Sequence, residues 1–132
     1  MLSLKIENQG YVDIMPESIL AFEEVAEGSL EDRPNTKCGI FFDIGEGITS
    51  VYVENSYDVI KSVVPRLNFE LNIPGVNARR ITIPRDGIIY RQAIVTPEGE
   101  EPGEAKTLIK FRLGTNVIPI TVKETREEID LK

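Results

Sequence analysis

Residues 80–90, RITIPRDGIIY, are the stretch from which the fold is interpreted. Apolar and polar residues alternate up to Ile83, then Pro84 and an Asp86-Gly87 pair interrupt the pattern before a second apolar run. Alternation with a period of two is typical of a strand with one buried face, and Asp-Gly supplies the positive φ of a tight turn. The stretch therefore predicts a β-hairpin.

The same pattern occurs in the first half of the chain, in VDIMPESILAFEEV, residues 12–25. Sliding the sequence along itself by 69 positions, without a gap, lays residues 4–63 over 73–132 and brings apolar positions into register almost throughout. We therefore predict one compact domain, residues 1–132, built from two pseudo-repeats, with chance similarity between two strand-rich halves as the alternative. The identical pairs include Ile14/Ile83, Ile19/Ile88, Ile40/Ile109, Phe42/Phe111, Gly45/Gly114, Val53/Val122 and Ile60/Ile129.

Each predicted repeat continues from its first hairpin into a polar loop, residues 26–37 or 96–106, which we expect to be exposed. A second hairpin turning at Gly45 or Gly114 follows, and then a short helix.

The expected helices are 57–63, capped by Asn55-Ser56, and 126–131, capped by Thr125. Segment 66–78 reads as a connecting strand and turn. The predicted fold class is mainly β, with α+β possible: about ten short antiparallel strands with one or two short helices.

Charge and composition limit the function. The chain has 15 Lys and Arg against 22 Asp and Glu, a net charge of -7, which repels nucleic acid and anionic membrane surfaces. It contains no signal-peptide pattern and no apolar stretch long enough to span a membrane. Because Cys38 is the single cysteine, an intrachain disulfide is impossible, and a cytoplasmic location, or a virion, is expected.

The residues that usually perform chemistry are scarce. There is no His, so the commonest general base and metal ligand are missing. Cys38 opens an apolar strand and is expected to be a buried hydrophobe. The acidic residues Asp43, Glu46 and Glu54 flank one hairpin, but the end of a solvated hairpin explains them better than a catalytic pair. We expect no enzyme activity, no cofactor and no metal.

The cationic residues gather around the hairpin predicted over residues 80–90. Residues 1–66 contain 5 basic and 12 acidic side chains, whereas residues 67–132 contain 10 of each. An arginine group can bind an anion or an acidic protein surface, and the acidic first half of a second copy provides such a surface. Scattered solvated arginines are the alternative. The candidate interface comprises Arg79, Arg80, Arg85, Tyr90 and Arg91.

Two further strings suggest a family. Residues 12–24, VDIMPESILAFEE, and 53–60, VENSYDVI, together with the strand pair turning at Gly45, resemble the small FlbD/SwrD-like flagellar-associated proteins. Residues 122–129, VKETREEI, give the second half the same closing pattern, so that the chain resembles a fused tandem duplication. The resemblance implies a small β fold and an accessory role without recognised catalytic residues.

These observations predict a non-enzymatic, oligomerising interaction or accessory protein of a bacterium or bacteriophage, with itself or another protein as partner. Two alternatives stay open. One is a virion structural accessory protein of a capsid or tail. The other is a binder of a small anion through the arginine-rich hairpin.

Overall fold

The computed structural model describes residues 1–26, 28–75 and 77–132. Glu27, part of the loop predicted over 26–37, and Val76, part of the segment predicted over 66–78, lie outside the described residues. The fold is mainly β, with 45% strand and 14% helix. The strands are β1 (Leu2–Ile6), β2 (Gly10–Ile14), β3 (Ile19–Glu24), β4 (Cys38–Asp43), β5 (Ile48–Val53), β6 (Phe69–Ile73), β7 (Arg79–Ile83), β8 (Ile88–Ala93), β9 (Thr107–Leu113) and β10 (Asn116–Val122). The helices are α1 (Tyr57–Val63) and α2 (Arg126–Asp130).

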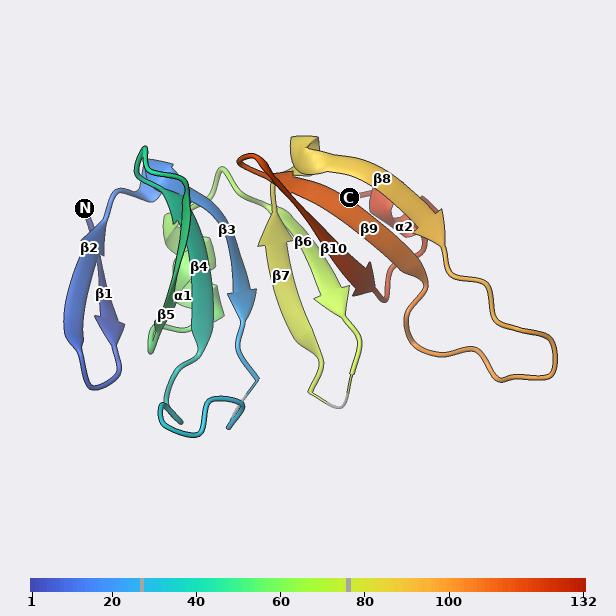
Figure 1. The fold of residues 1–132 in the computed structure, drawn as a ribbon, viewed down its shortest axis with the longest axis horizontal. Helices are drawn as coiled ribbons and strands as arrows, with labels where there is room; N and C mark the ends of the chain where they lie inside the picture. Colours follow the sequence, from blue (N-terminus) through green and yellow to red (C-terminus); the bar gives the residue numbers. More distant parts are fainter. Residues whose placement is uncertain (27, 76) are drawn as a thin grey trace.

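The strands lie in one row from β2 to β8 (Figure 1). A five-stranded antiparallel sheet has the order β5-β4-β3-β7-β6, flanked by the pair β1-β2 and the three-stranded sheet β10-β9-β8. Backbone hydrogen bonds link these sheets, from Glu54 N to Lys5 O and from Lys123 N to Asn72 O, each 2.8 Å. The β3–β7 pairing joins the two halves of the chain.

The predicted hairpin over residues 80–90 is wrong, and so is its counterpart in the first half. β7 pairs with β6 and β3, whereas β8 pairs with β9. Short 3₁₀ helices, Pro16–Ser18 and Arg85–Gly87, connect β2 to β3 and β7 to β8. Gly87 therefore serves close packing and not a tight turn, because a Cβ there would lie 2.9 Å from the backbone oxygen of Arg112.

The other predicted hairpins are confirmed: β4–β5 turns at Gly45 and β9–β10 turns at Gly114, both with positive φ. The expected strand within 66–78 is β6, which forms a hairpin with β7. Its counterpart β1, which pairs with β2, was not predicted.

Both helices begin at the predicted caps. The Ser56 side chain accepts a hydrogen bond from Val59 N, and Thr125 forms a capping box with Glu128. α2 ends at Asp130, one residue earlier than predicted.

Two apolar clusters form the core. The first lies among β1–β5 and α1 and contains Phe22 and Phe42, and the second lies mainly among β6–β10 and α2 and contains Phe111. Phe42 and Phe111, an identical pair at the offset of 69 positions, are both buried. Ala21 of β3 belongs to the second cluster, so apolar packing continues across the β3–β7 junction.

The offset of 69 positions that aligns the two halves of the sequence also separates the starts of most corresponding strands and helices. It separates the starts of β2 and β7, of the two 3₁₀ helices, and of β3 and β8. The β-bulges also match, one between Ile19 and Ala21 and the other between Ile88 and Tyr90. The starts of β1 and β6 depart slightly from the offset, because the segment 74–78 before β7 is longer than the segment 7–9 before β2. Descent from a tandem duplication stays a prediction.

Candidate functional site

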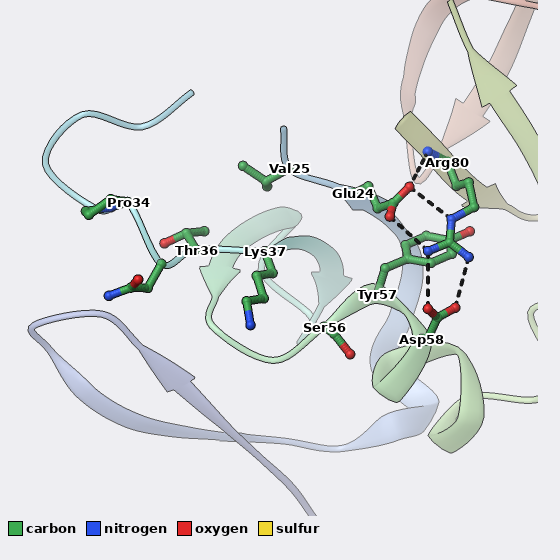
Figure 2. Close-up of a pocket in the computed structure, with 10 residues that line it drawn as sticks. Glu24, Val25, Pro34, Thr36, Lys37, Ser56, Tyr57, Asp58 and Arg80 are labelled. Atoms are coloured by element: carbon green, nitrogen blue, oxygen red, sulfur yellow. Dashed lines mark hydrogen bonds and ion pairs between the residues drawn. The ribbon is translucent and has the colours of Figure 1, made fainter. Parts of the chain in front are cut away.

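Arg80 lies at the junction between the halves (Figure 2). Its guanidinium binds Glu24 of β3, with Nη2–Oε2 at 2.8 Å, and Asp58 of α1, with Nη1–Oδ1 at 2.9 Å. It also stacks on the ring of Tyr57, 4.5 Å from the centroid. One side chain of β7 thus contacts a strand and the helix of the other half.

A cleft of about 330 Å³ opens beside this cluster, between α1 and the segment before β4 (Figure 2). Lys37, Ser56 and Thr36 contribute polar groups to its lining. The Ser56 hydroxyl is engaged as the helix cap. Thr36 Oγ1 is buried and has no hydrogen-bond partner within the described part of the chain.

The charged cluster consists of one guanidinium and two carboxylates. Hydrogen bonds from Arg80 lower the pKa of the Glu24 carboxyl, and they also lower the pKa of Asp58. Burial raises the pKa of the Tyr57 hydroxyl, which is hydrogen bonded to the Thr82 hydroxyl at 2.5 Å. Two carboxylates therefore outweigh the single positive charge of Arg80, and the cluster is better suited to holding β3, β7 and α1 together than to attracting an anion.

The predicted arginine group is divided by the fold. Arg79 and Arg80 lie on β7, where Arg79 faces the charge of Glu23. Arg85 and Arg91 line a separate cleft of about 200 Å³ near α2.

In that second cleft, Arg85 stacks on Phe69, 4.4 Å from the ring centroid, and donates to the backbone oxygen of Lys132. Arg91 binds Asp130 and donates to the backbone oxygen of Arg126 at 3.3 Å. Tyr90 points to Gln92, to which its hydroxyl donates a hydrogen bond. The five residues therefore do not form a single patch.

The remaining candidates are structural. Burial raises the pKa of the Cys38 thiol to about 12, as suits a buried hydrophobe. Asp43 accepts a hydrogen bond from Gly45 N, whereas Glu54 pairs with Lys5 at the opposite end of the β4–β5 hairpin. In residues 1–26, 28–75 and 77–132, no three His, Cys, Asp or Glu residues are grouped to hold a metal.

Sequence reasoning predicted β2 and β8 as strands but not that they lie at the two ends of the row. Within the described residues, β8 has β9 as its one hydrogen-bonded neighbour and β2 has β1. β8 exposes Ile89 and Tyr90, whose counterparts on β3 are half-buried Leu20 and buried Ala21. Only the strand order reveals this difference in exposure, because β3 and β8 both begin as apolar runs in the sequence.

None of the helices in the described ranges is long and apolar enough to cross a membrane. Comparisons of the chain with models of protein families, with curated proteins and with solved structures gave no match.

Proposed function

We propose that this protein is a non-enzymatic, self-associating interaction protein that serves as an accessory component in a bacterium or bacteriophage. The observation that carries the proposal is the outer edge of β8. β3 and β8 occupy corresponding places, but β7 covers the edge of β3, whereas β8 lies at the end of the row.

The exposed side chains support this interpretation. Ala21 on β3 is 1% exposed, whereas Tyr90 at the corresponding place on β8 is 43% exposed and its neighbour Ile89 is 48% exposed. A strand edge that combines unpaired backbone groups with apolar side chains is a template for pairing with another chain.

The polar groups argue against an enzyme. In the cleft beside Arg80, Ser56 caps a helix, and the carboxylates bind a guanidinium. Cys38 is buried, and its raised pKa keeps it a thiol. These arrangements stabilise the fold, and none of them joins an activated nucleophile to a base.

The small-anion alternative receives less support. It needs several guanidinium groups at one place, but Arg79 and Arg80 lie on β7, whereas Arg85 and Arg91 line a separate cleft. Arg80 is also bound by two carboxylates. A virion accessory protein and a cytoplasmic one would both use self-association, and the resemblance to FlbD/SwrD-like proteins favours an accessory role for either.

Light scattering on the purified protein over a range of concentrations tests the proposal. We expect the mass to exceed that of one chain and to rise with concentration. Ile89→Lys should reduce this association, whereas Val59→Lys on α1 is the matched control, because both side chains are 48% exposed. A wild-type protein that stays monomeric at high concentration would contradict the proposed function.

A further inference from the structure

We propose that the partner of β8 is strand β2 of a second copy, which adds to the sheet as β7 adds to β3 within one chain. This inference rests on the proposed function and specifies its surface. We call the two surfaces the β8 end (Ile89, Tyr90, Arg91, Gln92, Val117 and Arg126) and the β2 end (Tyr11, Val12, Asp13, Met15 and Ile44).

The topology supports this pairing. β7 corresponds to β2, and β3 corresponds to β8, at the same offset along the chain. The chain thus contains one β3–β7 junction and presents the two halves of another at its ends. β2 and β8 lie at opposite ends of the row in Figure 1, so that one copy can follow another.

The register of the β3–β7 pairing within one chain predicts the register of the β8–β2 pairing between two copies. Phe22 pairs with Thr82, and Glu23 pairs with Ile81, in antiparallel orientation. The corresponding residues are Arg91 with Asp13, and Gln92 with Val12. The first of these pairs brings opposite charges together across two strands, which is favourable.

The contacts of α1 also have complementary counterparts. Within the chain, the Tyr57 hydroxyl bonds to Thr82, and the Arg80 guanidinium lies over the Tyr57 ring. The residue corresponding to Tyr57 is Arg126 on α2. The counterparts of Thr82 and Arg80 are Asp13 and Tyr11 on β2.

Two interactions would therefore be replaced by chemically matched ones. In place of the hydrogen bond between two hydroxyls, Arg126 and Asp13 would form an ion pair. The cation–π stack would form between Arg126 and Tyr11, with the arginine now on the helix and the tyrosine on the strand. Tyr11 is 74% exposed in the single chain, and Asp13 and Arg126 are exposed as well. All three side chains are accessible to a second copy.

Apolar side chains at the two ends of the row also have counterparts at the internal junction. Inside the chain, Ile48 packs against the β9–β10 turn, where a Cβ on Gly114 would lie 2.8 Å from its Cδ1. The corresponding residues are Val117 and Gly45. Val117 is exposed, and so is Ile44 beside Gly45, although both are large and apolar. A second copy would cover them as the junction covers Ile48.

Pairing of two β8 strands is less favourable, because it would place arginine-bearing surfaces against each other. The β2–β8 contact joins different surfaces of the two copies, so it continues into an open chain or closes into a ring. Each copy in such an array uses both ends.

Reversal of the two charges tests the contact. Asp13→Arg and Arg126→Asp should each lower the association constant at low salt at least about tenfold, because each places like charges at the junction. An equimolar mixture of the two variants should form mixed dimers, since the unmutated β8 end of an Asp13→Arg copy then meets the unmutated β2 end of an Arg126→Asp copy. Both residues are exposed, and an acidic residue suits the first turn of α2, so the folds should persist.

Cysteine capture tests the register. A Val12→Cys copy mixed with a Gln92→Cys copy should form a disulfide-linked dimer, and neither variant should do so alone. Cys38 is buried and should not compete.

The outcomes separate the two proposals. Oligomers that yield no mixed disulfide and do not respond to charge reversal would overturn the β2–β8 pairing and leave self-association intact. Disulfide formation by Gln92→Cys alone would show β8–β8 pairing instead and would also overturn it. A monomeric wild type would overturn both proposals.

Discussion

Arg80 of β7 and Glu24 of β3 form a two-point contact across the junction of the two halves: Nε lies 2.9 Å from Oε1, and Nη2 lies 2.8 Å from Oε2. The backbone nitrogen of Arg80 also donates to Oε1 at 2.8 Å. The Glu24 carboxylate therefore binds both the side chain and the backbone of Arg80, where β3 and β7 pair over a short length. This makes the pair a sensitive point for the stability of the whole row.

Arg80→Met should lower the free energy of unfolding by roughly 1–2 kcal/mol, since a bidentate, partly buried charged pair contributes more than an exposed one. Urea denaturation at pH 7 measures the change. Arg112→Met, at an exposed position on β9, is the control and should change the free energy by less than about 0.5 kcal/mol. Equal effects of the two substitutions would show that the junction contact adds nothing.

The same pair should make stability depend on pH. Hydrogen bonds from Arg80 hold the folded-state pKa of Glu24 below 4.5, so its contribution is present above about pH 4.5 and is lost as the pH falls through the folded pKa. The pKa of Asp58 is lowered by the same arginine. Between pH 7 and pH 3, the wild type should therefore lose more stability than Arg80→Met. Parallel pH profiles of the two proteins would contradict this.

Glu23 should behave in the opposite way. Burial raises its pKa, so the ionised carboxylate costs stability at neutral pH, and the cost disappears as the pH falls through the folded pKa. Glu23→Gln should raise the Tm at pH 7, with a gain that shrinks towards pH 4. The corresponding residue of β8 is already a glutamine, Gln92. A lower Tm at pH 7 would show that attraction to Arg79 outweighs burial.

Local patterns in the sequence were sufficient for several elements. The glycine turns of β4–β5 and β9–β10 and the caps Ser56 and Thr125 depend on neighbouring residues, and the structure confirms all four.

The partners of β7 could not be read in this way. Its neighbour β3 is distant in the sequence, since the contacting residues Glu24 and Arg80 are 56 positions apart. Nothing in the local sequence distinguishes that pairing from a hairpin with β8. Glu24 and Asp58 were missed as partners of Arg80 for the same reason. The exposed edge of β8 likewise follows from the strand order and not from its composition.

The two apolar clusters should respond alike to truncation. Phe42→Ala and Phe111→Ala should each cost about 3–5 kcal/mol, because each removes a buried ring from its cluster. Phe42→Leu, which keeps most of the volume, should cost less than about 1.5 kcal/mol. Chemical denaturation at low protein concentration measures all three. A loss below about 1 kcal/mol for Phe42→Ala would mean that the first cluster rearranges around the cavity.

The hydroxyls of Tyr57 and Thr82 should show coupling across the junction. The side chains come from α1 and β7, Thr82 is fully buried, and the two oxygens are 2.5 Å apart. Tyr57→Phe and Thr82→Val should each cost roughly 1–3 kcal/mol, because each leaves the other hydroxyl buried without its partner.

The double variant should cost less than the sum of the two, since it removes both hydroxyls together. Urea denaturation of the four proteins at pH 7 gives the coupling energy. Thr121→Val on β10, an exposed position, is the control for threonine replacement and should be nearly neutral. Strictly additive costs would show that the hydroxyls act independently, and the proposed replacement of this contact by Arg126 and Asp13 between copies would then lose its internal precedent.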